Sequence, residues 1–228
     1  MSETDQQRRV SGLMERFEAS SDAFEREQLA AKALRAARDG MDLRAIPAIA
    51  ERLAEVRTAR RQRAIEADAL YMLDEPFDDE TPVLPGLYLL EPPLLVGADA
   101  RRLRLMAFEQ QVPAMTLCRE PITRLGQCPL VAIAPGATMR TRIDPPDGES
   151  PLEHWVVQAY DELGRFAIGS LDPEIAAIKR LDQLLDRSDA LPEHGPIYDT
   201  IATVAIEAAV EEEDPNAPRR RRTSRKTA

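Results

Sequence analysis

The chain has 228 residues, enough for one large domain or for one medium domain with appendages. Hydrophobic residues make up 43% of it but aromatic residues only 4%, so we expect a core of mainly Leu, Ile, Val and Ala. The formal net charge of -10 disfavours nucleic acid and anionic lipid as partners of the protein body, apart from local basic patches.

Composition also indicates where the protein resides. No run approaches the roughly 20 apolar residues that a membrane span needs, and the start MSETDQQRRV lacks the apolar stretch of a secretory signal. Two cysteines without such a signal favour free thiols in a reducing compartment. Frequent Arg and Ala are typical of a GC-rich bacterial genome. We therefore expect a bacterial, cytoplasmic protein that makes no membrane contact.

A helical hairpin is predicted over residues 1–74, and its first helix runs from about residue 4 to residue 39. Spacings of three and four residues define a seam, six of whose eight positions are apolar. These positions are Val10, Leu13, Phe17, Ser20, Phe24, Glu27, Ala31 and Leu34. Gly40 follows as a plausible C-cap. So narrow a seam cannot form a core alone, and it must pack on the rest of the chain or on another copy.

The second helix of this hairpin begins near Asp42, which is a candidate N-cap. Its apolar stripe is interrupted by Arg60, Arg61 and Arg63 and resumes as far as Tyr71. The segment that follows, residues 75–86, is acidic and rich in Pro, and we interpret it as a linker.

A mixed sheet domain is predicted over residues 87–171. The apolar runs LYLLEPPLLVG and VPAMTLC flank the helical pattern ARRLRLMAFEQQ, which indicates one βαβ unit with parallel strands. CPLVAIAPG and ATMRTRID add extended pieces. In HWVVQAYDELGRFAIGSL, apolar residues alternate on both sides of Asp161–Gly164, and this pattern predicts a β-hairpin with Gly164 in a left-handed conformation.

Two helices are predicted over residues 172–213, with Asp172 as N-cap and Pro173 in the first turn of the first helix. They are expected to pack on the sheet. Residues 214–228 have the composition of a disordered basic tail. The fold class is therefore α+β: an N-terminal helical hairpin, a small mixed sheet with one βαβ unit and a β-hairpin, and two C-terminal helices.

The two cysteines give the most specific chemical hypothesis. Two Cys and two His without paired spacing do not indicate a metal site, and the expected compartment disfavours a disulfide. The simplest interpretation is that Cys118 and Cys128 are reduced, buried thiols in a strand–turn–strand segment. The sharper alternative is a catalytic pair of Cys118 and His154, in which Asp161 or Glu153 orients the imidazole and the imidazole generates the thiolate.

Other candidate sites are weaker. Arg119 and Glu120 follow a predicted strand, where the Arg could clamp an anion or form an ordinary surface ion pair with an acidic neighbour. Asp144, Asp147 and Glu149 cluster in a Pro-Pro turn that is typical of a solvated loop. Glycine-rich nucleotide-binding motifs are absent from the sequence. We therefore expect no cofactor and no metal, and the lack of a catalytic motif favours a protein that is not an enzyme.

The C-terminal tail carries six positive charges within eight residues. Such a run supports salt-sensitive, sequence-independent contact with nucleic acid, or it is a solubilising end. The residues are Arg219, Arg220, Arg221, Arg222, Arg225 and Lys226.

Three functional hypotheses follow from these patterns. The leading one is an interaction or scaffold protein that forms a homo-oligomer or binds a helical partner through the hairpin of residues 1–74. The second is an enzyme or small-ligand-binding protein with its site at the strand ends near Cys118, Arg119 and His154. The third is nucleic-acid association through the tail.

Overall fold

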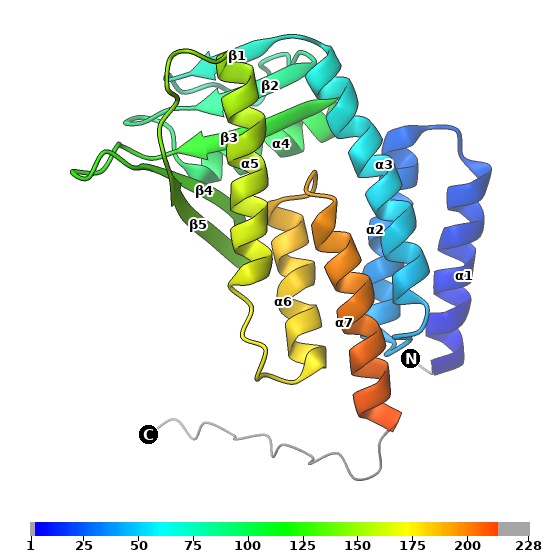
Figure 1. Ribbon diagram of the computed structural model, residues 1–228. Helices are drawn as coiled ribbons and strands as arrows, with labels where there is room; N and C mark the ends of the chain where they lie inside the picture. The colour runs from blue at the N-terminus through cyan, green and yellow to red at the C-terminus, as the bar shows by residue number, and fades with distance from the viewer. Residues whose placement is uncertain (1–2, 214–228) are drawn as a thin grey trace, which may run out of the picture.

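The structure is a computed structural model that describes residues 3–213. Over that range the chain is α+β, as predicted, and Figure 1 shows the sheet on one side of the molecule and most of the helices gathered on the other. In chain order the elements are α1 (Glu3–Ala19), α2 (Ala23–Asp39), α3 (Ile46–Glu66), β1 (Leu70–Leu73), β2 (Gly86–Leu90), α4 (Gly97–Glu109), β3 (Ala114–Arg119), β4 (Cys128–Ala134), β5 (Ala137–Ile143), α5 (Leu152–Gly169), α6 (Ala177–Ala190) and α7 (Pro196–Glu213).

The sheet has the strand order β1-β2-β3-β4-β5. The first three strands are parallel, and β4 runs antiparallel to both of its neighbours. The predicted βαβ unit is confirmed as β2-α4-β3. The hairpin of the sheet is β4-β5, in which Ala134 pairs with Ala137 around the turn at Pro135 and Gly136.

Helices cover both faces of the sheet because its side chains alternate between two cores. Leu87 and Leu89 of β2 belong to the main core, which also contains apolar residues of α3, α5, α6 and α7. Tyr88 and Leu90 of the same strand belong to a smaller core beneath α4. Figure 1 shows α5 crossing the face of the sheet opposite to α4.

The prediction of a β-hairpin around Gly164 is wrong, because this segment is the helix α5. Its buried side chains recur every three or four residues, at Val156, Ala159, Tyr160, Leu163 and Ala167. Trp155 and Val157, which suggested strand alternation, are only partly buried. Gly164 lies within the helix, where a Cβ would clash with the ring of His194. The glycine therefore permits close packing and does not form a turn.

The N-terminal segment contains two helices where one was predicted. α1 ends at Ala19, and Asp22 then caps α2 by accepting a hydrogen bond from the backbone N–H of Glu25 at 2.7 Å. The predicted Gly40 C-cap of α2 is confirmed. Further along, α3 ends at Glu66, so the predicted continuation of that helix to Tyr71 is also wrong.

The predicted seam packs on the rest of the chain. Val10, Phe17 and Leu34 are buried in the main core together with residues of α3, α6 and α7. This burial explains the seam without a second copy. Self-association and a helical partner remain predictions that the single chain does not test.

The main core also joins the segments that were predicted as separate domains. Leu70–Leu73, at the end of the predicted hairpin region 1–74, form the edge strand β1 of the sheet. The predicted linker 75–86 connects β1 to β2 and includes Gly86, the first residue of β2. α6 and α7 pack against each other, with α6 on β4 and β5 and α7 on α3. No helix within residues 3–213 is long and apolar enough to cross a bilayer.

Candidate functional site

A cavity of about 330 Å³ lies at the carboxyl edge of the parallel strands, and we call it the strand-edge cavity. It collects residues from the ends of β1, β2 and β3, from the start of the antiparallel β4, from the segment after β5 and from the first turn of α5. The lining residues are Met72, Leu89, Glu91, Arg119, Ile122, Cys128, Pro145, Pro146, Leu152 and Trp155. In open α/β sheets this edge is where ligands bind.

An ion pair sits among the apolar walls of this cavity. Nε and Nη2 of Arg119 lie 2.7 and 2.6 Å from Oε1 of Glu91. The two side chains are only 25% and 16% exposed, so the pair is more shielded from water than an ordinary surface ion pair. Both contacts use Oε1, and Oε2 makes no hydrogen bond with another residue in 3–213. The cavity thus offers a free acceptor beside a guanidinium.

Trp155 is held in place by the segment that follows β5. Its indole Nε1 donates a hydrogen bond to the carbonyl of Asp144 at 3.1 Å. Cys128 lines the cavity but is only 1% exposed, and burial raises the pKa of its thiol. The Arg119–Glu91 ion pair is therefore the polar part of a cavity whose other walls are apolar.

The structure separates the remaining candidates that the sequence singled out. Cys118 is fully buried in the core beneath α4, and burial, followed by the charges of Glu120 and Asp99, raises the pKa of its thiol to about 12. His154 is exposed in the first turns of α5, on the opposite face of the sheet. Cys118 thus lacks both the imidazole partner and the low pKa that a thiolate nucleophile needs.

Two further candidates also lie outside the cavity. Glu120 pairs not with Arg119 but with Arg140 of β5, at 2.7 Å, an ion pair that the sequence analysis did not predict. The basic residues of the tail, 219–226, lie outside the described range. Within residues 3–213, no three Cys, His, Asp or Glu side chains group closely enough to hold a metal ion.

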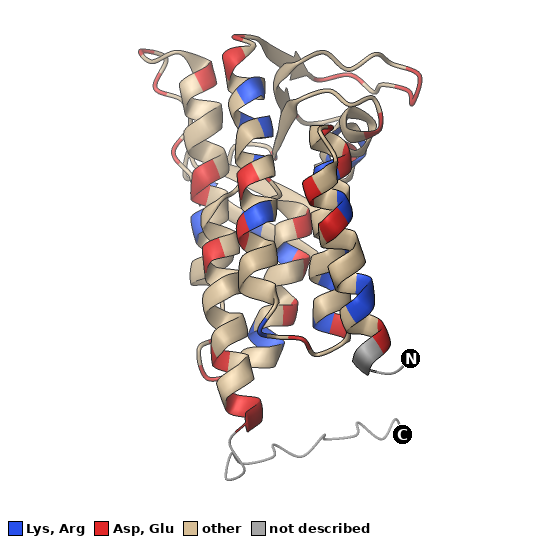
Figure 2. Ribbon diagram, turned by 90° about the vertical axis from the view of Figure 1, so that its right-hand side faces the viewer, with Lys and Arg blue, Asp and Glu red and all other residues tan. Residues whose placement is uncertain are grey.

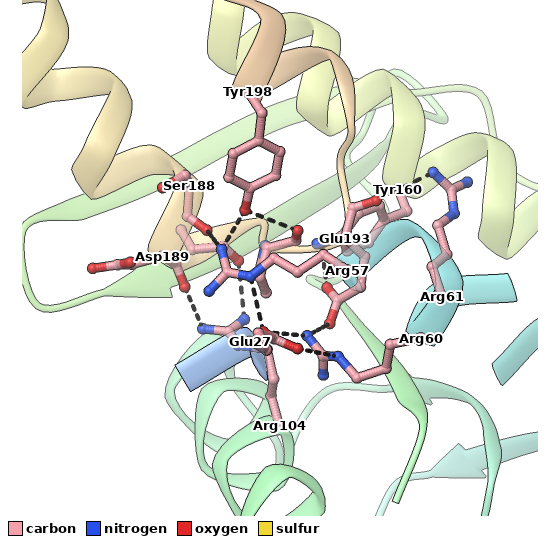
Figure 3. Close-up of polar contacts among 12 residues, drawn as sticks. Glu27, Arg57, Arg60, Arg61, Arg104, Tyr160, Ser188, Asp189, Glu193 and Tyr198 are labelled. Carbon is pink, nitrogen blue, oxygen red and sulfur yellow. Dashed lines mark hydrogen bonds and ion pairs between the residues drawn. The ribbon is translucent and has the colours of Figure 1, made fainter. Parts of the chain in front are cut away.

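A second site, which sequence reasoning missed, is a set of charged side chains buried between the helices. We call it the buried arginine cluster, and Figure 3 shows its contacts. Its five charged members come from α2, α3, α4 and the segment before α7, and each is less than 10% exposed. They are Glu27, Arg57, Arg60, Arg104 and Glu193.

Glu27 is the shared acceptor of the cluster. Its carboxylate lies 2.8 Å from Nε of Arg57 and 2.9 Å from Nε of Arg60. Arg60 also reaches Oε1 of Glu193 at 3.0 Å, and the other oxygen of Glu193 accepts a hydrogen bond from Tyr160 at 2.6 Å. Two carboxylates therefore neutralise two arginines that have almost no access to water.

The positive charges of the neighbouring arginines determine the direction in which the pKa of Glu193 is shifted. Burial raises the pKa of Glu193, but Arg60 and Arg104 outweigh this effect and hold the pKa below its ordinary value. Burial and the adjacent Glu193 raise the pKa of Tyr160. At neutral pH Glu193 is therefore ionised while Tyr160 remains a neutral hydrogen-bond donor.

Arg104 is held differently from the other two arginines of the cluster. It donates hydrogen bonds to the backbone carbonyls of Asp189 and Ala190, both at 2.9 Å, at the C-terminal end of α6. Helix C-termini carry unsatisfied carbonyls and partial negative charge, so a cation is stabilised there. Burial lowers the pKa of Arg104. Arg104 thus ties α4 to the end of α6.

A neighbouring group extends the polar contacts to α5. Arg61 makes two hydrogen bonds to the carboxylate of Asp161, both at 2.8 Å, and Nδ1 of His194 lies 3.5 Å from the same carboxylate. Burial raises the pKa of Asp161, but the contacts with His194 and Arg61 outweigh burial and lower the pKa to about 2. The buried arginine cluster and the Arg61–Asp161–His194 group together connect α2 and α3 to α5, the helix that covers the sheet.

The sequence carried one signal of the buried cluster. Glu27 occupies a seam position of the first predicted helical segment, and Arg60 and Arg61 interrupt the stripe of the next. Charged residues on apolar faces indicate buried pairing, but nothing in the sequence showed that Glu193 and Arg104 would join them. Comparisons with models of known protein families, with curated proteins and with solved structures find no match to this chain.

Proposed function

We propose that this protein binds a small molecule in the strand-edge cavity. The observation that carries the proposal is the combination, in one cavity of about 330 Å³, of apolar walls with a shielded Arg119–Glu91 pair. Small-molecule sites are concave and mostly apolar, with a few polar groups that orient the ligand. The position at the carboxyl ends of β1, β2 and β3 supports the same conclusion.

The lining indicates the chemistry of the ligand. Trp155, Leu89 and Ile122 favour a flat, largely apolar or aromatic molecule. Because the ion pair is neutral overall, it suits an uncharged polar group that accepts from Arg119 and donates to the free Oε2 of Glu91. An amide or an amino-substituted heterocycle has this pairing of donor and acceptor.

Binding is favoured over thiol chemistry at this site. Cys128 lines the cavity, but its raised pKa keeps the thiol protonated at neutral pH. A protonated thiol is a poor nucleophile and behaves as a small apolar side chain.

The test uses the fluorescence of Trp155, which is the only tryptophan of the chain and lines the cavity. We would titrate the protein with a panel of aromatic amides and aminoheterocycles and follow its emission. The first variant is Arg119→Met, which keeps the apolar stem and removes the guanidinium. The control is Arg140→Met, which removes a more exposed Arg–Glu pair of the same sheet outside the cavity.

The proposal expects a saturable change in emission for at least one chemical class in the wild type. Affinity should fall about tenfold or more in Arg119→Met, as for loss of a hydrogen bond to a charged group, and should stay unchanged in Arg140→Met. A panel without saturable responses would contradict the proposal, and so would equal losses in the two variants.

A further inference from the structure

A second cavity, of about 320 Å³, lies among α1, α2, α3 and α6, and we call it the helical cavity. It shares no lining residue with the strand-edge cavity. Four basic and two acidic side chains line it, whereas the whole chain carries a net charge of -10. The charged residues are Arg9, Lys32, Arg35, Arg57, Asp39 and Asp189.

Arg57 supplies a buried, preorganised cation to the helical cavity. It is 8% exposed, and its guanidinium is fixed by Glu27 at 2.8 Å, by the hydroxyl of Tyr198 and by the carbonyl of Ser188 at 3.4 Å. Figure 3 shows Tyr198 and Ser188 on one side of the guanidinium and Glu27 on the other. They use Nε and Nη1, and Nη2 makes no hydrogen bond within residues 3–213. A guanidinium held in this way retains N–H donors for an oxyanion at little entropic cost.

Two more cations reach the cavity from neighbouring helices. Arg9 of α1 and Lys32 of α2 are exposed, and neither forms an ion pair with a residue in the described range. Figure 2 shows acidic and basic residues on α1 near the N-terminus, and both kinds are interspersed along the other helices of that face. Arg35 differs, because Asp186 and Asp189 neutralise it. Within the described residues, the lining therefore holds two cations without an ion-pair partner, Arg9 and Lys32, and one such carboxylate, Asp39, beside Arg57.

We propose that the helical cavity binds a small multivalent oxyanion, either a compound with phosphate groups or a polycarboxylate. Arg57 meets one anionic group at the floor, and Arg9 and Lys32 meet another at the rim. Guanidinium and ammonium donors converging on a cavity of this size suit that chemistry, because charge-assisted hydrogen bonds to oxyanions are stronger than neutral ones.

The experiment is isothermal titration calorimetry of the full chain at constant ionic strength, with pyrophosphate and with citrate as probes. Arg9→Gln and Lys32→Gln each remove one rim charge at an exposed position, so the fold is preserved. Arg8→Gln is the matched control, because Arg8 is an exposed neighbour on the same helix that does not line the cavity. The two probes distinguish phosphate from carboxylate ligands.

We expect one saturable site for at least one probe in the wild type and in Arg8→Gln. Its affinity should fall about tenfold in each of Arg9→Gln and Lys32→Gln. Three results would overturn the proposal: no saturable binding of either probe, an equal loss in the control, or unchanged binding in both rim variants. The last result would place the anion elsewhere, for example on the basic residues 219–226, which all the variants retain.

Discussion

Replacing Glu27 by Gln should destabilise the protein far more than removal of an exposed carboxylate. Glu27 is 3% exposed and is an ion-pair partner of both Arg57 and Arg60. The amide keeps the shape of the side chain but removes the negative charge between the two guanidinium groups. Arg60 retains Glu193, whereas Arg57 loses its only carboxylate partner within the described residues.

The magnitude follows from the cost of an uncompensated buried charge. Breaking a buried pair by removing one partner costs about 3–5 kcal/mol. The matched control is Glu55→Gln on α3, where the side chain is 50% exposed and pairs with Arg52 at 3.1 Å. Exposed ion pairs contribute less than about 1 kcal/mol to stability. The free energy of unfolding lost in Glu27→Gln should therefore be several times that lost in Glu55→Gln.

The assay is urea unfolding followed by far-ultraviolet circular dichroism. With a slope of about 2 kcal/mol per molar urea, the loss at Glu27 lowers the unfolding midpoint by about 1.5–2.5 M. The double variant Glu27→Gln/Arg60→Gln should cost less than the sum of its single changes, because the removed charges belong to the same pair. A loss no larger than that of Glu55→Gln would refute the account of the cluster as a charge-balanced unit.

Three further predictions concern α5, its neighbours and the thiols. Gly164→Ala should lower the free energy of unfolding by about 1–3 kcal/mol, because the new methyl group clashes with His194. The control Gly169→Ala lies in the same helix and has nothing within 4 Å of the added Cβ, so it should leave the thermal stability unchanged or raise it. Asp161→Asn, which weakens the contact with Arg61, should cost about 1–2 kcal/mol at pH 7 after allowance for solvent screening. The pKa of Asp161 is about 2 in the folded state and higher in the unfolded state. The stability that its carboxylate contributes is therefore present at neutral pH and is lost as pH falls from about 4 to 2. The free energy of unfolding of the Asn variant should depend less on pH in that window. Both thiols are buried with raised pKa values, so neither should react quickly with a thiol reagent at pH 7.5 until urea is added, and fast labelling of the native protein would contradict this.

The sequence was most informative where local pattern and tertiary burial agree. The βαβ unit could be predicted because its apolar strands and its helix of about a dozen residues have distinct periods. The C-terminal helices could be predicted for the same reason, although α6 begins at Ala177 and Asp172 instead accepts a hydrogen bond from the backbone N–H of Glu174. In that position the predicted N-cap forms a turn before the helix.

The errors arose where one pattern fits two structures. In α5 the apolar residues satisfy a period of two over short stretches and a period of 3.6 over the whole segment, and packing on the sheet selects the helix. β1 has only four residues, Leu70–Leu73, and continues the apolar pattern of the preceding helix. Residues 70–73 form a strand because they pair with β2, and their own sequence does not distinguish a strand from a helix.

The candidate site was predictable only in part. Arg119 was singled out and does line the strand-edge cavity. Trp155 and Met72 could not be assigned to that cavity, because the first was placed in a hairpin and the second beyond a helix end. Glu91 follows β2 and meets Arg119 across neighbouring strands, a pairing set by strand register and not by sequence spacing.

The most direct test of the proposed function is the nuclear magnetic resonance signal of the indole N–H of Trp155, which is a single peak because the chain has one tryptophan. Addition of a bound aromatic amide or aminoheterocycle should move that peak in a saturable way, and the effect should need a much higher ligand concentration in Arg119→Met. If compounds that bind the protein shift other amide signals and leave the indole peak in place, the strand-edge cavity is not the binding site.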